Sequence, residues 1–233
     1  DFLSSFSAVE GKKVLVHGGG RTATAIAAKL GIETKMVGGR RITDKDMLDV
    51  VTMVYGGLVN KNIVAGLQSR GINASGLTGA DMDIIRSEKR PVKDIDYGYV
   101  GDVKAVKGDM LKILVESDIT PVVAPLTHDG KGNMLNTNAD TMAASVAKGL
   151  IGLYDVTLTF CFEMPGVLRN PEDPNSVIPV ITPESFEELK ASGIVSGGMI
   201  PKIENAIDAV KAGVSKVVIT KADALNAGTT IKL

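Results

Sequence analysis

Short apolar runs alternate with amphipathic stretches along this chain, and the alternation predicts an α/β protein. The runs are rich in β-branched residues, are short enough for buried strands, and lie at residues 12–17, 74–77, 120–126, 155–162 and 215–220. The amphipathic stretches, with apolar positions every three or four residues, lie at residues 22–30, 110–117, 139–150, 183–192 and 200–212. This order favours a largely parallel central sheet between two layers of helices. We therefore expect a three-layer αβα sandwich formed by one domain, residues 1–233.

Less regular segments lie between these elements. Residues 84–107 predict hairpins, and residues 127–138 predict a polar loop. Thr43 is the expected N-cap of a helix that bends at Gly56–Gly57 and ends at Gly71.

Composition narrows the class of protein and its partners. Of the 233 residues, 44% are hydrophobic but only 4% are aromatic, so the core must consist mainly of aliphatic side chains. The net charge is −1 with acidic and basic residues interleaved, which argues against a nucleic-acid partner. We expect no membrane span, since no apolar run approaches the ~20 residues that a bilayer requires, and no secretory leader. The single cysteine, Cys161, is expected to fill the core. These features predict a soluble, cytoplasmic protein.

A strand that runs directly into three glycines and a helix carries the strongest chemical indication. The segment Val14–Arg21 reads Val-Leu-Val-His-Gly-Gly-Gly-Arg. Three glycines let the backbone approach a ligand, and the unpaired N–H groups that open the helix attract an anion. The combination is typical of a phosphate site, with a tight turn that binds nothing as the alternative.

A second glycine turn, at residues 196–198, precedes Lys202 in the first turn of a helix. A positive charge there opposes the helix dipole, and a bound phosphate would remove the conflict. Lys202 is therefore a candidate phosphate ligand, with a solvated lysine as the alternative. Arg40 and Arg41 offer forked donors for a carboxylate, although two adjacent arginines alone more often face solvent.

Polar side chains crowd the segment before the helix at residues 139–150. Asn136 and Asn138 could hold a small polar substrate, and Asp140 could orient a lysine or an ammonium group. A purely structural alternative makes Asn138 the N-cap of the helix.

The spacing Gly18-x-Gly20-x-x-Ala23 also fits a dinucleotide-binding fingerprint loosely. That fingerprint expects an acid about 20 residues further on to hold the ribose. The second extended piece ends in Val-Gly-Gly at residues 37–39, without an acid. A nicotinamide-dependent dehydrogenase is therefore a less favoured class of enzyme.

Together these stretches resemble the amino acid kinase family, and most closely its acetylglutamate kinase members. The matching pieces follow the family's order over nearly the whole chain, at residues 16–20, 39–43, 59–61, 136–143, 165–168 and 197–202. The ordered set is specific, although each piece alone is not. Arg21 and Glu163 depart from the pattern, because proline and aspartate are usual at those positions. The resemblance also implies an opening strand before Asp1, with a lysine and a Gly-Gly pair that hold the ATP phosphates.

What the resemblance implies is ATP-dependent phosphorylation of the side-chain carboxylate of N-acetyl-L-glutamate, or another N-acylglutamate, in arginine biosynthesis. Gly19 and Gly20 would bind the substrate and the transferred phosphoryl group through backbone N–H groups. Arg41 would bind the substrate α-carboxylate, and Asn136 and Asn138 would bind the acylamino group.

For the phosphoryl donor, the resemblance implies that Lys202 stabilises the negative charge on the phosphoryl group during its transfer. It also implies that Asp140 orients Lys202 and that Mg²⁺ bridges the phosphates of ATP. The implied nucleotide pocket consists of Glu163, Met164, Pro165, Gly166, Val167, Leu168, Ile194, Val195 and Ser196. The N-terminal half would bind acylglutamate and form a homodimer, and the C-terminal half would bind the nucleotide. Alternatives are a carbamate, aspartate or nucleotide kinase of the same superfamily, and a non-catalytic amino-acid-binding module.

Overall fold

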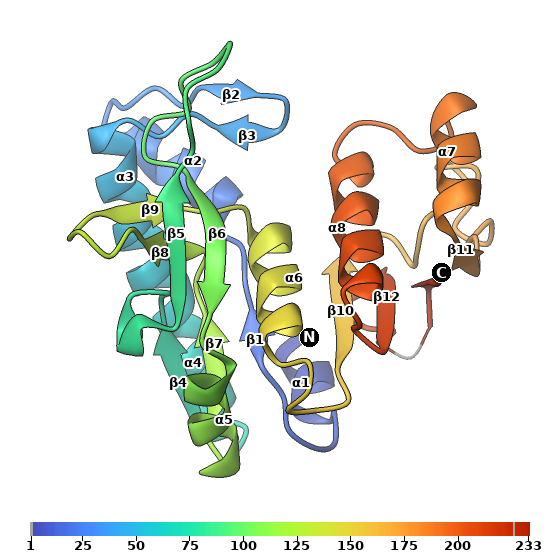
Figure 1. Cartoon of the computed structure of the whole chain (residues 1–233), viewed down its shortest axis with the longest axis horizontal. Coiled ribbons are helices and arrows are strands. Elements are labelled where there is room, and N and C mark those ends of the chain that lie inside the picture. The colour runs from blue at the N-terminus through green and yellow to red at the C-terminus, as the bar shows by residue number, and fades with distance from the viewer. Residues whose placement is uncertain (1, 226) are drawn as a thin grey trace. The chain divides into compact units, whose positions relative to one another are not determined.

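The computed structural model describes residues 2–225 and 227–233 (Figure 1). The chain divides into two compact units. The inner unit is Glu10–Met142, and the terminal unit joins residues 2–9 to residues 143–233. Helix α6, Ala139–Gly149, begins in the inner unit and ends in the terminal unit.

A three-stranded parallel sheet forms the centre of the inner unit, in the order β1-β7-β4. Its strands are β1 (Leu15–Val16), β7 (Thr120–Val123) and β4 (Ala74–Leu77). Val122 and Val123 in the middle strand are completely buried. The parallel pairing predicted from the buried apolar runs is therefore confirmed, although β1 and β7 are shorter than their runs.

Helices pack against this sheet and against one another. They are α2 (Gly20–Lys29), α3 (Lys45–Val51), α4 (Asn60–Gln68) and α5 (Gly108–Glu116). The predicted N-cap of α3 was wrong by one residue, because the Asp44 carboxylate accepts from the Met47 N–H at 2.9 Å. The Thr43 hydroxyl has other partners: it donates to the carbonyl of Arg41 and accepts from the amide of Asn136.

The predicted bend at Gly56–Gly57 is instead a π-helix, η1 (Thr52–Val59), that joins α3 to α4 without a break. The continuous helix Lys45–Gln68 is long and apolar enough to cross a membrane by length and composition alone, contrary to our expectation. In this structure 33% of its most apolar stretch is buried, and the buried residues belong to the inner unit. Val51, Val54 and Tyr55 are each at most 5% exposed and pack with residues of α2 and β8.

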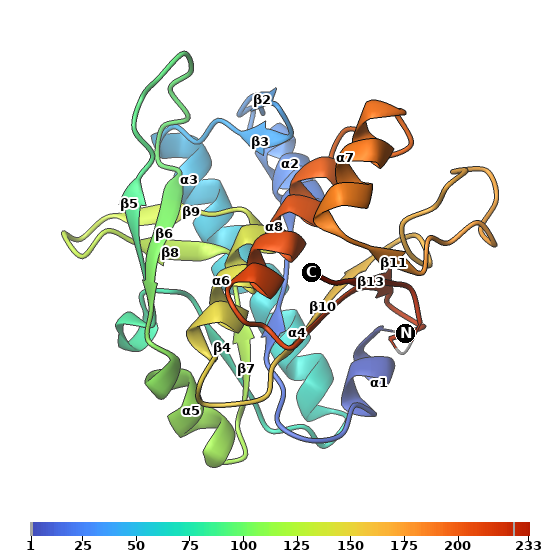
Figure 2. The ribbon, with the colours of Figure 1, turned by 45° about the vertical axis from the view of Figure 1, so that its right-hand side comes forward.

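Two further sheets complete the inner unit (Figure 2). Strands β2 (Met36–Val37) and β3 (Arg40–Arg41) form an antiparallel ribbon. A four-stranded sheet has the order β6-β5-β8-β9, with β5 (Ile85–Lys89), β6 (Gly101–Val106), β8 (Leu126–His128) and β9 (Met134–Asn136). The hairpin predicted at residues 84–107 is confirmed, but the polar loop predicted at residues 127–138 was wrong. Its polar residues form a tight turn between β8 and β9, in which the Asp129 carboxylate accepts from the N–H groups of Lys131 and Asn133.

Three basic side chains surround one carboxylate of the inner unit, that of Asp83. Asp83 accepts from Arg86 at 2.8 Å and from Lys107, and a ring nitrogen of His128 lies 2.7 Å from its other oxygen. The hydrogen bond from Lys107, with help from Arg86, lowers the pKa of Asp83 from 3.8 to about 2. Asp83 therefore links the turn before β5 to the end of β6 and to β8.

This cluster should make stability depend on pH in the acid range. Because the pKa of Asp83 is lower in the folded chain, its stabilising effect is complete above about pH 3.8 and is lost as the pH falls towards 2. We expect Asp83→Asn to lower the melting temperature at pH 7 and to change it little near pH 2. Asp94→Asn, at the exposed tip of the β5–β6 connection, is the control and should have no effect at either pH. A pH-independent loss in Asp83→Asn would contradict this explanation.

The terminal unit has a four-stranded sheet of mixed direction, in the order β10-β12-β13-β11. Its strands are β10 (Thr157–Phe162), β12 (Lys216–Lys221), β13 (Thr229–Ile231) and β11 (Val180–Ile181). Its other helices are α1 (Phe2–Ser7), α7 (Pro183–Ala191) and α8 (Met199–Lys211). The neighbouring strands β10 and β12 are parallel, as expected, whereas β12 and β13 are antiparallel. The short strands β11 and β13 were missed.

Candidate functional site

A pocket of about 200 Å³ lies in the inner unit, beyond the carboxyl end of β1. The glycine turn, β3, η1, the β5–β6 hairpin and the segment that enters α6 all contribute to its wall. It brings together the residues predicted to bind the substrate, which are Gly19, Gly20, Arg41, Asn136 and Asn138. Parallel α/β sheets characteristically bind ligands at this edge.

The glycine turn places the N-terminus of a helix at the pocket. Gly19 is the N-cap of α2, and the first turn of that helix holds no acidic residue. The first N–H groups of a helix have no partner within the helix, and the helix dipole favours an anion at this place. A Cβ atom on Gly19 would lie 2.7 Å from the ring of Tyr55, so the turn lies directly against η1.

Arg41 is 8% exposed and makes more contacts with the protein than two adjacent arginines would suggest. One terminal nitrogen donates to the carbonyl of Gly20 and the hydroxyl of Thr24, both at 3.0 Å. The other donates to Thr34 at 3.2 Å. The guanidinium group thus ties the start of α2 to the β2–β3 ribbon, and its charge lies beside the glycine turn.

The two asparagines have different local roles. Asn136 is 7% exposed, and its amide donates to the Thr43 hydroxyl at 3.0 Å. The Asn138 side chain accepts from the N–H of Thr141 at 3.0 Å, so Asn138 does cap α6. Asn138 also lines the pocket, and its predicted contact with the substrate stays a prediction. Asp140 lies in the first turn of the same helix.

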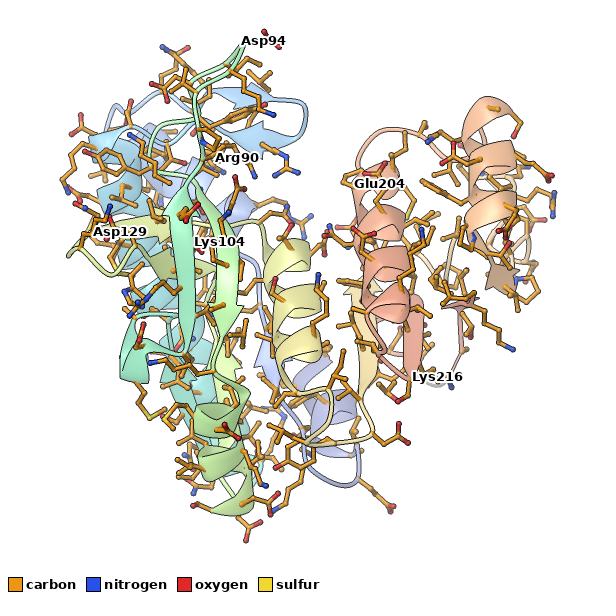
Figure 3. All side chains as sticks on the ribbon, viewed as in Figure 1. Arg90, Asp94, Lys104, Asp129, Glu204 and Lys216 are labelled. Carbon is orange, nitrogen blue, oxygen red and sulfur yellow. The ribbon has the colours of Figure 1, made fainter. Side chains whose placement is uncertain are left out.

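Tyr55 and Arg90 are among the residues of the pocket wall that were missed in the sequence. Burial raises the pKa of Tyr55, against the opposing effect of the Arg41 charge. Arg90, which is labelled in Figure 3, directly follows β5. It donates to the Asp102 carboxylate at 3.0 Å and lies over the ring of Tyr97. The pairing of β5 with β6 brings Arg90 and Asp102 together, and no short sequence motif marks that pairing.

In the terminal unit, Lys202 lies in the first turn of α8, as predicted. Its ammonium group lies 5.1 Å from the ring centre of Phe160 and 6.0 Å from that of Phe162. These rings stabilise the cation at the carboxyl end of β10. Cys161, between them, is half-buried, and burial raises the pKa of its thiol. The pairing of Lys202 with Asp140 would join the two units, and it stays a prediction.

The predicted nucleotide residues also lie in the terminal unit. Val167 and Val195 are each 2% exposed and belong to its hydrophobic core, whereas Glu163 and Ser196 are exposed. The N–H of Val167 donates to the Thr229 hydroxyl at 2.8 Å. Binding of a nucleotide by these two segments stays a prediction. Among residues 2–225 and 227–233, no group of three or more potential metal-ligating side chains is found.

Known proteins match this chain over nearly its full length. The amino acid kinase family matches residues 1–221. An acetylglutamate kinase of Phocaeicola vulgatus is 67% identical, covering 99% of this chain and 90% of the relative, and that of Bacteroides thetaiotaomicron is 64% identical over the same shares. The crystal structure of smu.665 from Streptococcus mutans UA159 superposes with a TM-score of 0.86 at 32% identity, covering 100% of this chain and 91% of that one.

These matches extend over both units and include each segment on which the resemblance rested. The glycine turn at the pocket and Lys202, in the first turn of α8, both lie within the matched residues 1–221. On this evidence the chain belongs to the amino acid kinase family.

Proposed function

We propose that this chain transfers the γ-phosphoryl group of ATP to the side-chain carboxylate of N-acetyl-L-glutamate, a step of arginine biosynthesis. Relatives 60–67% identical carry the name acetylglutamate kinase, which is an enzyme with a carboxyl acceptor. The observation that carries the proposal is the pocket of the inner unit. It combines a helix N-terminus with buried guanidinium and amide groups, as an anionic acylamino acid requires.

The acceptor would lie in this pocket, and each of its two carboxylates would contact a different part of the pocket wall. The side-chain carboxylate would face the N–H groups of Gly19 and Gly20, where the phosphoryl group arrives. Arg41 would contact the α-carboxylate, with Arg90 as a second guanidinium in the same wall. Asn136 and Asn138 would hold the acylamino group. One carboxylate oxygen then forms a bond to the γ-phosphorus as the bond to the leaving oxygen of ADP breaks.

The donor would bind to the terminal unit. Glu163 to Leu168 and Ile194 to Ser196 would hold the nucleotide, and Lys202 would lie at the transferring phosphoryl group. Asp140 would set the position of Lys202. Mg²⁺ would enter with ATP and be held by the phosphates, where it adds the second cation that phosphoryl transfer needs. We further propose that the chain is a cytoplasmic homodimer that dimerises through its N-terminal half.

The direct test is turnover of the purified full chain with ATP and N-acetyl-L-glutamate. Hydroxylamine traps the acyl phosphate as a hydroxamate, which is measured together with ADP. N-succinyl-L-glutamate, aspartate and carbamate are offered in parallel, and binding of NADH is titrated separately. We expect the hydroxamate with an N-acylglutamate only. Turnover with another acceptor, or binding of NADH in place of ATP, would assign a different function.

Arg41→Lys should raise the KM for N-acetylglutamate and leave the KM for ATP nearly unchanged. Losing a charge-assisted contact with the guanidinium group costs roughly 1.5–3 kcal/mol, which corresponds to an increase of about 10- to 150-fold. The measurement is a pair of saturation curves, one for each substrate. Equal increases in both constants would mean that Arg41 acts only by tying α2 to the β2–β3 ribbon.

A further inference from the structure

A hydrogen-bonded network of polar groups lies next to the glycine turn, and its two central side chains, those of His17 and Asn60, are buried and do not line the pocket. His17, the residue after β1, is 7% exposed, and its Nδ1 lies 2.6 Å from the carbonyl oxygen of Gly18. Its Nε2 lies 3.1 Å from the side-chain nitrogen of Asn60, which is 1% exposed. The ammonium group of Lys61 completes the network at its other end and lies 3.3 Å from the Asn60 amide oxygen.

The groups at the two ends of this network determine the direction of every hydrogen bond within it. Lys61 can only donate, so the Asn60 oxygen accepts from it, and the Asn60 nitrogen must point the other way. That nitrogen donates to the carbonyl of Val122 at 2.9 Å and to Nε2 of His17. Nε2 is therefore the acceptor, and the proton of the neutral ring resides on Nδ1. From there it is donated to the carbonyl of Gly18, which can only accept.

The opposite tautomer would create two conflicts at once. An Nε2–H would face the N–H of Asn60, and the lone pair of Nδ1 would face that of the Gly18 carbonyl. The doubly protonated ring would keep the first conflict and add a charge near the Lys61 ammonium group. Burial also lowers the pKa of His17, so the neutral ring is favoured near pH 7. Among the described residues, Lys61 is the charged group that these hydrogen bonds connect to the ring.

The orientation of one peptide plane follows from this tautomer. The peptide between Gly18 and Gly19 is planar and trans, so its N–H points opposite to its C=O. With the carbonyl held by His17, the N–H of Gly19 points away from the buried network. Gly18 and Gly19 both line the pocket, whereas His17, Asn60 and Lys61 lie outside its wall.

We propose that His17 is a positioning residue: as the Nδ1–H tautomer set by Asn60 and Lys61, it holds the Gly18–Gly19 peptide so that the Gly19 N–H faces the bound anion. The ring itself neither touches the substrate nor exchanges a proton with it. This role rests on the proposed function only in the identity of the anion.

The tautomer can be read directly, because the chain contains only two histidines, His17 and His128. Long-range ¹H–¹⁵N spectra of the ¹⁵N-labelled full chain distinguish a protonated from an unprotonated ring nitrogen, and His128→Gln assigns the two rings. We expect Nδ1 of His17 to be protonated and Nε2 to be unprotonated at pH 7.5. The Nε2–H form, or a mixture of both, would overturn the proposal whatever the enzyme's activity.

A matched pair of variants tests the consequence. The amide nitrogen of an asparagine occupies the position of Nδ1, and that of a glutamine the position of Nε2. His17→Asn should therefore keep the donor to Gly18, and His17→Gln should lose it. We expect kcat for His17→Gln to lie about 10- to 100-fold below that of His17→Asn, which is the scale on which small misplacements act. Ser87→Ala, which removes a buried hydroxyl of β5, controls for general loosening of the inner unit and should match the wild type.

Two readouts separate this role from a merely structural one. Melting temperatures of the two variants should be equal, and the KM for ATP should be the same in both. The Gly19 amide signal should shift when N-acetyl-L-glutamate is added to the wild type and to His17→Asn, but not to His17→Gln. Equal kcat values in the pair, or a Gly19 amide that does not respond in the wild type, would overturn the proposal. Absence of turnover together with a responding Gly19 amide would refute only the proposed function.

Discussion

Replacing Lys202 with methionine should lower kcat by about 100- to 1000-fold and change the KM for N-acetylglutamate little. Charge develops on the transferring phosphoryl group, and a preorganised cation or donor at that place typically contributes this much. Methionine keeps the unbranched stem that packs beside Phe160 and Phe162, so the fold should survive. Steady-state kinetics at saturating ATP and Mg²⁺ measure the effect.

Lys211→Met is the matched control, because Lys211 is an exposed lysine in the last turn of the same helix. It should retain full activity. A tenfold increase in the KM for ATP at unchanged kcat would show that Lys202 binds the ground state of the nucleotide. An unchanged Lys202→Met enzyme would remove Lys202 from the reaction altogether.

Gly19→Val should abolish turnover and lower the melting temperature. The sequence suggests that a side chain at this position would fill the space of the ligand. The structure gives a different neighbour, because the added Cβ would lie 2.7 Å from the buried ring of Tyr55. Overpacking of this kind costs about 1–3 kcal/mol, and Tyr55 or the turn must move to relieve it. Both line the pocket, so displacement of either should reduce activity by ~100-fold or more.

The control for this substitution is Gly57→Ala in η1, where a Cβ would meet no atom within 4 Å. Thermal unfolding and the hydroxamate assay are run on both variants. A Gly19→Val enzyme with the melting temperature and turnover of the wild type would mean that the turn has room for a side chain.

The sequence predicted the elements that carry a strong local pattern. The parallel strands around Val122 and Phe160 were predicted because buried β-branched runs of this length have few other solutions. Strands β11 and β13 were missed because two or three residues are too few to show a period. The N-cap of α3 lies one residue later than predicted. The reason is that the Thr43 hydroxyl accepts a hydrogen bond from the side-chain amide of Asn136, which is distant in the sequence.

The same division applies to the pocket. Its glycines, arginine and asparagines belong to contiguous motifs, and the structure does bring them together. Tyr55 and Arg90 were missed because each reaches the pocket through tertiary structure. Tyr55 does so through a π-helix that shifts the face of a long helix, and Arg90 through the register of a hairpin. Neither arrangement leaves a local mark in the amino-acid pattern.

The Asn60 amide also constrains how this protein can change during evolution. A Cβ atom on Gly76, in β4, would lie 1.8 Å from the Asn60 amide oxygen, so any side chain there displaces the amide. A smaller residue at position 60 would accommodate it, but would leave Nε2 of His17 without its donor. The residues at positions 17, 60 and 76 therefore cannot be substituted independently of one another. We expect selection to remove single substitutions at any of these positions. Compensating substitutions should occur together, even though position 76 does not line the pocket.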